Sequence, residues 1–322
     1  MQPNDSSPPP SGLRAEPANP AESEFAKEYR DLAAQCRQKF AEPSFDLPTL
    51  PASAMRVLSL VQDPDVSPRK IAQALQTDPV LIAKFLRLAN SPFYMGARAV
   101  ESVQAAIDRL GLYTVRSVVL TIALNSAVLR EKRLGKSALA MWDHALNTAV
   151  AIQDLGMRLH MAHSVLFVLG LMHDIGKLPC WLMLYELTAK RPGMRPEFLQ
   201  SLVEEVHMDV GEVLMDVWKM PLEVSVAVGG HHRISSIEEA NYFVMRKYPN
   251  LGVSECNVLA IMLSCVSVAD SALAALGLSD EANDLNLGRK GLFTDLGLSE
   301  EQVTEYLSSL PKHIKEHGLV DF

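Results

Sequence analysis

The sequence predicts an all-α fold. Hydrophobic residues recur at spacings of three and four along most of the chain, which is the period of an amphipathic helix. Pairs of a capping residue and a proline, which start helices, are frequent. No stretch alternates apolar and polar residues with the β-branched enrichment that is typical of a strand. These three observations favour a protein built almost entirely from helices.

The first residues combine a low-complexity segment with one amphipathic helix. Residues 1–20 are rich in Pro, Ser and Asn, a composition typical of disorder. Over residues 21–42 an apolar stripe predicts a helix, and its members are Phe25, Tyr29, Leu32, Cys36 and Phe40. Such a stripe usually packs on the chain's own domain, and a docking helix for a partner protein is the alternative.

Signals for the starts and ends of helices are dense beyond this segment. Ser67 and Asp78 each precede a proline, so each is expected to cap a short helix. Ser102 is expected to start another helix and Gly111 to end it. Longer helical patterns follow at residues 113–131, 137–160, 163–173, 196–218, 221–230 and 254–276. No internal repeat of fixed period is present, so we expect one domain with two helical halves.

Composition and charge exclude several classes of protein. The net charge of −8 argues against a broad nucleic-acid-binding surface, which needs clustered Lys and Arg. The four cysteines lack the spacing of a disulfide framework, which indicates reduced thiols in a cytoplasm. The N-terminus has no apolar signal core, and no uncharged run reaches the roughly 20 residues of a membrane helix. We therefore expect a cytoplasmic protein that binds neither nucleic acid nor a membrane.

The stretch "GLMHDIGK" places His173 beside Asp174 at the end of a strongly apolar run. A buried carboxylate without a partner is costly, so such groups usually form ion pairs or bind metal. Other histidines and an aspartate in the C-terminal half also have apolar neighbours, namely His144, His207, His231, His232 and Asp270. Taken alone, such a histidine is more often a core residue with one hydrogen bond, and Asp270 could cap a helix. Taken together, these residues favour one shared cause.

Metal binding is the shared cause that this chemistry suggests. Imidazole and carboxylate groups suit Fe, Mn, Zn or Ni, and one carboxylate can bridge two ions. Two ions about 3.5–4 Å apart can clamp the oxygens of a phosphoester and activate water. We therefore predict that two divalent ions are bound by His144, His173, Asp174, His207, His231, His232 and Asp270. His231 and His232 are expected to approach from a helix end opposite the others and to serve the second ion.

The same pattern resembles the HD metal-dependent phosphohydrolase superfamily. Stretches in both halves are similar to the HDOD domain, a signalling relative of the HD and HD-GYP domains, and the match is tightest in the N-terminal half. The stretches that carry this similarity include "LPTLPASAMRVLSLVQDPDV", "VESVQAAIDRLGLY", "WDHALNTA" and "HMDVGEVLMDVWKMP". The resemblance implies an HD-type helical core preceded by an HDOD-type helical half. It implies an HDOD domain over residues 43–245, with the helices of residues 246–322 completing the core.

The resemblance also implies a role. HDOD proteins are typically bacterial regulators of signalling or stress physiology, often without catalysis. The residues after His232 read "RISSIEEANYF" and lack the Gly-Tyr-Pro signature of the HD-GYP phosphodiesterases. Hydrolysis of cyclic dinucleotides is therefore not implied.

Two hypotheses of function follow. The first is a regulator that binds metal together with a signalling protein or a small phosphorylated ligand. The second is a metal-dependent phosphohydrolase or phosphodiesterase that acts on a nucleotide or another phosphoester. In the second, Asp174 and Lys177 would be catalytic, and Lys177 and Arg233 would bind phosphate through charge-assisted hydrogen bonds. The simpler interpretation of each cation is a solvated surface residue.

Overall fold

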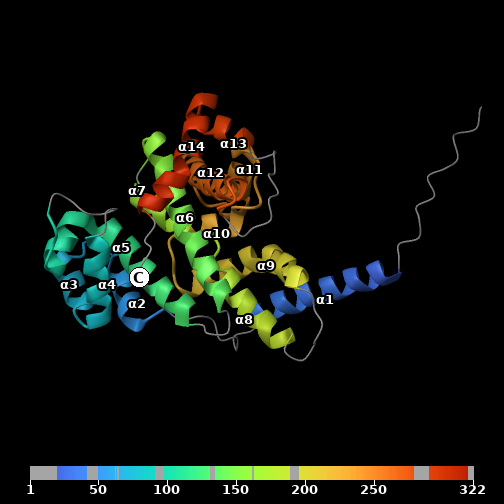
Figure 1. The fold of residues 1–322 in the computed structure, drawn as a ribbon, viewed down its shortest axis with the longest axis horizontal. Coiled ribbons are helices and arrows are strands. Elements are labelled where there is room, and N and C mark those ends of the chain that lie inside the picture. Colours follow the sequence, from blue (N-terminus) through green and yellow to red (C-terminus); the bar gives the residue numbers. More distant parts are fainter. Residues whose placement is uncertain are drawn as a thin grey trace, which may run out of the picture.

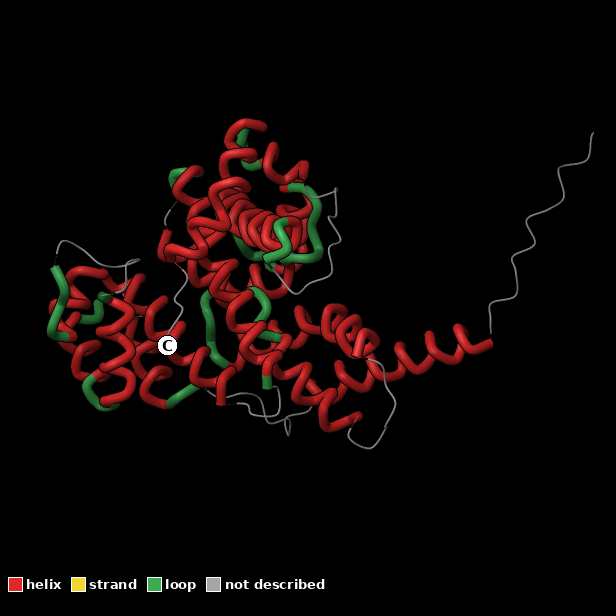
Figure 2. Tube along the Cα trace, in the orientation of Figure 1, coloured by secondary structure: helices red, strands yellow, loops and turns green. Residues whose placement is uncertain are grey.

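The computed structural model describes residues 20–41, 50–61, 63, 65–90, 98–130, 135–161, 163–188, 196–278 and 290–317. Within these ranges the regular elements are helices, which confirms the predicted all-α class (Figures 1 and 2). The helices are α1 (Pro20–Ala41), α2 (Ala52–Val61), α3 (Pro68–Leu75), α4 (Pro79–Ala89), α5 (Val103–Arg130), α6 (Lys136–Arg158), α7 (His163–Met172), α8 (Lys177–Thr188), α9 (Pro196–Val217), α10 (Leu222–Gly230), α11 (Ile237–Lys247), α12 (Val253–Ala275), α13 (Lys290–Asp295) and α14 (Glu300–His317). The predicted disordered tail lies outside the described residues, apart from Pro20.

Helices α2, α3, α4 and the first part of α5 form the N-terminal half. The capping residues predicted from the sequence start two of them. The Ser67 hydroxyl accepts a hydrogen bond from the Lys70 N–H at 3.4 Å, and the Asp78 carboxylate accepts from Val80 and Leu81 at 3.0 and 3.1 Å. Both pairings satisfy N–H groups that have no partner within the first helical turn.

A sharp bend in α5 leads from this half into the next. Gly111 has a φ of 71°, a conformation that residues with a side chain adopt rarely. The segments Val103–Leu112 and Thr114–Val128 meet there at 114°. The predicted helix end at Gly111 is therefore a change of direction between two continuous helical segments.

Helices α6, α7, α9, α10 and α12 form the C-terminal half, and α14 packs along α6. The Tyr306 side chain on α14 is fully buried, and its hydroxyl donates a hydrogen bond to the Ala151 carbonyl at 3.1 Å. One continuous apolar core runs from the N-terminal half through α6, α7 and α12 to α14.

Helix α1 packs on α8 and α9, beside the main core (Figure 1). Leu32, Cys36 and Phe40 are buried there in a second apolar cluster with residues of α8 and α9. Arg37 adds ion pairs to Glu205 at 2.9 Å and Asp209 at 3.2 Å. The described part of the predicted stripe thus packs on the chain's own domain, while the side chains of Phe25 and Tyr29 lie outside the described set.

Two helical segments are long and apolar enough to cross a membrane by length and composition alone. They are Val165–Glu186 and Val253–Ala275, and a bent pair within α5 also passes this test if taken as one span. In the fold, 83% and 61% of their apolar windows are buried inside the protein. Both segments also contribute charged side chains to the site described below.

Candidate metal centre

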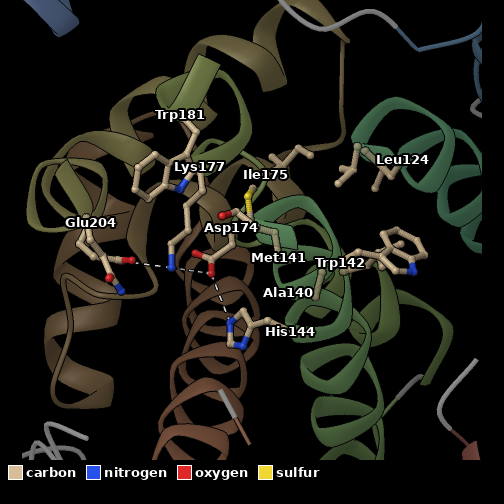
Figure 3. A pocket seen from close by; sticks show the side chains of 15 residues that line it. Leu124, Ala140, Met141, Trp142, His144, Asp174, Ile175, Lys177, Trp181 and Glu204 are labelled. Atoms are coloured by element: carbon tan, nitrogen blue, oxygen red, sulfur yellow. Dashed lines mark ion pairs between the residues drawn. The ribbon is translucent and has the colours of Figure 1, made fainter. Parts of the chain in front are cut away.

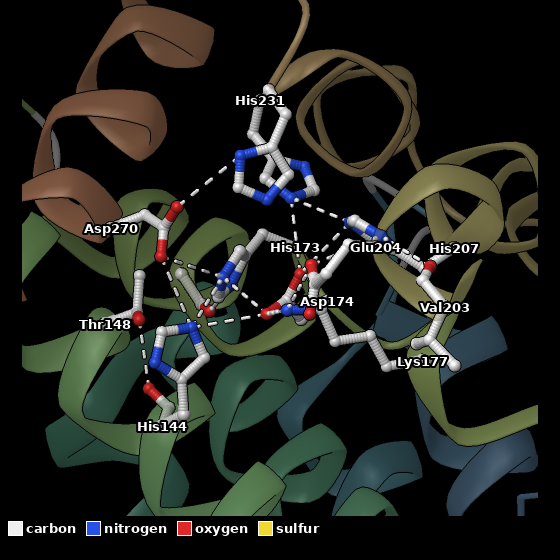
Figure 4. Close-up of polar contacts among 12 residues, drawn as sticks. His144, Thr148, His173, Asp174, Lys177, Val203, Glu204, His207, His231 and Asp270 are labelled. Atoms are coloured by element: carbon white, nitrogen blue, oxygen red, sulfur yellow. Dashed lines mark hydrogen bonds and ion pairs between the residues drawn. The ribbon is translucent and has the colours of Figure 1, made fainter. Parts of the chain in front are cut away.

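The structure brings every histidine and aspartate of the predicted ligand set to one place in the C-terminal half (Figure 4). His144 lies on α6, His173 and Asp174 on the turn after α7, His207 on α9, His231 and His232 after α10, and Asp270 on α12. All of them are buried except His232, whose side chain is 21% exposed. Residues far apart in the sequence therefore meet within the hydrophobic core.

The first group of donor atoms surrounds one point between α6, α7 and α12. The His144 Nε2 atom lies 3.2 Å from His173 Nε2, 3.2 Å from Asp174 Oδ2 and 3.3 Å from Asp270 Oδ1. His173 Nε2 lies 3.2 and 3.8 Å from the same two oxygens. Ligands that share an ion at about 2.0–2.2 Å stand about 3–3.6 Å apart at tetrahedral or octahedral angles. The spacing fits one divalent ion.

The second group uses the other oxygen of Asp174. His207 Nε2, His231 Nε2 and Asp174 Oδ1 form a triangle in which each side is 3.3 Å. His232 belongs to the same group, because its donor atom lies within 4.8 Å of the other three. Its Nδ1 atom is also 3.8 Å from Asp270 Oδ2. Asp174 thus faces one group with each oxygen, which is the geometry of a bridging carboxylate.

Backbone carbonyls orient three of the histidine rings. The Nδ1 atoms of His173, His207 and His231 lie 2.7, 3.1 and 3.0 Å from the carbonyl oxygens of Gly170, Val203 and Ala227, respectively. Because a carbonyl only accepts, each Nδ1 carries a proton, so a ring that has lost its Nε2 proton presents the Nε2 lone pair to its group. Opposing Nε2 atoms stand 3.2 and 3.3 Å apart, and lone pairs at that distance repel unless a cation or a proton lies between them. The donor set therefore fits two metal ions.

The electrostatics of the two groups differ. Burial alone would raise the pKa of the Asp174 carboxyl, but positive charge on His173 and Lys177 holds that pKa well below its usual value. Burial also opposes charge on His144, yet hydrogen bonds to the two carboxylates raise its pKa to about 10. In the second group, burial lowers the pKa of His207 to about 3. The carboxylates of Asp174 and Asp270 thus favour the protonated form of His144 in the first group. His207 in the second group is neutral near neutral pH.

Lys177 is a buried counter-ion and not a solvated surface cation. It is the first residue of α8 and is 6% exposed. Its Nζ atom lies 2.9 Å from Asp174 Oδ2 and 3.1 Å from Glu204 Oε2 (Figure 3). Glu204 is not part of the set predicted from the sequence. The available signal was its position three residues before His207, which places both on one face of α9.

The structure places Arg233 outside this cluster. Its guanidinium pairs with Asp209, and with Glu212 at 3.6 Å, at 35% side-chain exposure. Asp209 also pairs with Arg37 of α1, so one carboxylate joins the N-terminal helix to the residue that follows His232.

Two glycines let the turn with His173 and Asp174 approach its neighbours closely. A Cβ atom on Gly170 would lie 2.6 Å from the Ala149 Cα of α6. A Cβ atom on Gly176 would lie 1.9 Å from the His207 carbonyl oxygen of α9. Neither position was singled out from the sequence, because a glycine in an apolar run does not reveal which backbone it contacts.

A cavity of about 190 Å³ reaches the first group from one side (Figure 3). Its polar lining is contributed by Ser137, His144, Asp174, Lys177, Gln200 and Glu204, and residues of α5, α6, α7 and α8 contribute an apolar wall. A ligand in this cavity would contact the ligand side chains directly.

Comparison with known proteins agrees with this fold. The model of the HDOD domain matches residues 47–234. A candidate metal-dependent phosphohydrolase from Shewanella amazonensis has a similar solved structure, with a TM-score of 0.66 at 22% identity over 90% of this chain and 98% of that one. An HDOD domain protein of unknown function from Geobacter sulfurreducens gives a TM-score of 0.56 at 21% identity, covering 88% and 99% of the two chains.

A candidate signal transduction protein from Marinobacter aquaeolei gives a TM-score of 0.59 at 21% identity, over 91% of this chain and 64% of that one. No curated protein matches the chain. Since the HDOD model covers more than half of the sequence and the solved structures share its fold, the chain belongs to the HDOD domain family.

Proposed function

We propose that this protein is a cytoplasmic bacterial regulator of signal transduction whose C-terminal half holds two divalent metal ions. The observation that carries the proposal is the Asp174 carboxylate, whose two oxygens face two separate groups of histidine nitrogens. His144, His173 and Asp270 would hold the first ion with Asp174, and His207, His231 and His232 the second. The protein would act by binding a signalling protein or a small phosphorylated ligand. It would bind neither nucleic acid nor a membrane.

The site's own residues would determine what such a centre can do. Bound ions of this kind polarise phosphoryl oxygens and acidify water. Lys177 neutralises Asp174 and so keeps a buried carboxylate ionised and available to both groups. The backbone hydrogen bonds to His173, His207 and His231 hold the rings in place before any ion binds.

Metal analysis of the purified protein tests the two-ion centre. The wild type, loaded with Fe, Mn, Zn or Ni and then desalted, should retain about two ions per chain. His207→Ala should retain one, because only the second group loses a donor, whereas Asp174→Asn should lose both. His160→Asn is the matched control, since His160 is exposed and its φ of 55° suits asparagine. A wild type that retains no ion, or a His207→Ala chain that matches the control, would contradict the centre.

A second candidate function is metal-dependent hydrolysis of a phosphoester. The cavity beside His144 and Asp174 favours it, because a ligand there could meet the first ion and Lys177 together. Metal-loaded protein should then turn over nucleotides, cyclic nucleotides or artificial phosphodiesters, and Asp174→Asn should abolish the turnover. If every metal-loaded preparation is inert, the regulatory function stands without catalysis.

A further inference from the structure

The cavity beside the candidate metal centre has an apolar wall that the proposed function does not use. Leu124 of α5 and Leu171 of α7 form part of this wall, and two tryptophans and a methionine complete much of it: Met141, Trp142 and Trp181. The wall therefore combines side chains from the α5 segment beyond the bend with side chains of the C-terminal half. Figure 3 shows Trp181 on one side of Asp174, and Leu124 and Trp142 on the other side.

The polar end of the cavity carries little positive charge. Among the described residues that line it, Lys177 is the cation, and it already pairs with Asp174 and Glu204. A ligand with several phosphates would bring negative charge beside these two carboxylates. Like charges repel, so each additional phosphate is less favourable beside these carboxylates. The charges of the lining favour a ligand with one phosphate, placed against the metal ions.

The size of the cavity restricts the rest of the ligand. A dry cavity of about 150 Å³ holds benzene in proteins, and this one measures about 190 Å³. An aromatic ring or a short alkyl chain would occupy much of this volume. A sugar would place some of its hydroxyl groups against the apolar wall, away from the polar residues that line the cavity, which is unfavourable.

We propose that this cavity is the specificity pocket of the site and selects a phosphomonoester with a compact apolar group. The phosphate faces the metal centre, and the apolar group lies among Leu124, Met141, Leu171 and the two tryptophans. The proposal rests on the two-ion centre proposed above and adds the class of ligand to it.

Binding of two phosphonates, which contain no hydrolysable ester bond, measures this preference. Isothermal titration calorimetry of the metal-loaded protein should give a dissociation constant for phenylphosphonate roughly tenfold or more below that for methylphosphonate, because only the former buries a ring. Phenylphosphonate should also change the tryptophan emission, since two of the chain's three tryptophans line the cavity. Tighter binding of adenosine monophosphate than of phenylphosphonate would overturn the proposal in favour of a nucleotide ligand.

Filling the cavity provides the decisive variant. Ala140→Phe adds a ring at a partly exposed position of α6 that lines the cavity and is not one of the proposed metal ligands. It should remove the preference for phenylphosphonate and leave both the affinity for methylphosphonate and the metal content unchanged. Ala105→Phe is the matched control, because Ala105 is exposed on α5 and does not line the cavity.

Metal content is measured on the same samples, so a failure of the two-ion centre can be told apart from a failure of the proposed ligand class. A chain that holds no metal overturns both the centre and the ligand class. A metal-loaded chain that binds the two phosphonates equally, or loses its preference equally in Ala105→Phe, overturns the ligand class alone.

Discussion

At the scale of single residues, the position of the candidate site depends on contacts between backbones. Gly170, near the end of α7, lies against α6, and Gly176, in the turn that carries His173 and Asp174, lies against α9. A side chain at either glycine would separate the turn from the helices that hold His144 and His207. The glycines therefore determine whether the donor atoms can meet.

Gly176→Ala should destabilise the protein and reduce its metal content. The added Cβ would lie 1.9 Å from the His207 carbonyl oxygen, so α9 and the turn must move apart. Overpacking of this kind costs about 1–3 kcal/mol, which lowers the melting temperature by several degrees in differential scanning calorimetry. Gly291→Ala is the control, because nothing lies within 4 Å of the corresponding Cβ atom. Equal melting temperatures for the two variants would show that the turn tolerates the methyl group.

The set of candidate ligands and the separate position of His231 and His232 could be predicted from the sequence, but the grouping of His207 with those two residues could not. Imidazoles and carboxylates in apolar surroundings need a partner wherever they are, and that requirement is visible in the residue types. Which oxygen of Asp174 faces His144 and which faces His207 depends on how the helices pack. The pairing of Lys177 with Glu204 depends on the contact between α8 and α9 in the same way.

At the scale of helices, the local signals were more reliable for starts than for ends. Ser67 and Asp78 cap α3 and α4 as predicted, because capping needs only the side chain and the next few N–H groups. Helix α8 was not predicted, since it is apolar on nearly all sides and shows no helical period. Helix α14 continues through Pro311, a residue that normally ends a helix.

Helix α11 was also not predicted, although a signal was present. Ser236 accepts a hydrogen bond from the Glu239 N–H at 3.2 Å, which is the pairing of an N-cap with the third helical residue. This cap starts α11 directly after the residues "RISS". The spacing of Ser236 and Glu239 was readable from the sequence alone.

The thiol of Cys36 should report whether α1 stays docked on α8 and α9. Burial raises its pKa to about 11, so little thiolate forms near neutral pH and alkylation should be slow. Leu32→Ala removes a buried neighbour on α1 and should speed the labelling of Cys36 by iodoacetamide, measured by mass spectrometry of its peptide. Ala34→Ser, at an exposed position of α1, should leave the rate unchanged. Labelling of the native wild type as fast as of the unfolded chain would contradict the docked helix.

Tyr306 should be the main contact that holds α14 on α6. Tyr306→Ala removes a fully buried ring and should lower the free energy of unfolding by about 3–5 kcal/mol, as measured by urea denaturation. Tyr306→Phe should cost only about 1 kcal/mol, because it removes the hydrogen bond to Ala151 and keeps the ring. If both variants lose equal stability, the hydrogen bond and not the packing would dominate.

At the scale of the whole molecule, buried thiols link stability to alkaline pH. Burial raises the pKa of Cys36, Cys180 and Cys265 above the ordinary value of 9.0. Above that value the unfolded chain loses these protons and the folded chain keeps them, so the unfolded state is favoured as pH rises. Well below it the thiols are protonated in both states and do not make stability depend on pH.

The free energy of unfolding should therefore fall between about pH 9 and pH 11. Urea denaturation at several pH values measures the slope. Cys265→Ala should make the slope shallower, because one of the groups that titrates only after unfolding is gone. The remaining slope comes from the other buried thiols, from Tyr248 and Tyr306, whose pKa values burial also raises, and from His144, which the folded chain keeps protonated up to about pH 10. A stability that is constant across this range would contradict the buried, protonated thiols.

The contact between His144 and Asp270 has a further consequence for how the protein folds. These side chains stand 3.3 Å apart, yet nearly the whole C-terminal half of the chain lies between them in sequence. Closing so long a loop is entropically costly and slow compared with forming local helical contacts. The donor atoms can therefore converge only after α12 has returned onto α6. Metal uptake during refolding would mark the return of α12 onto α6, and a nascent chain that still lacks α12 would have no completed first group.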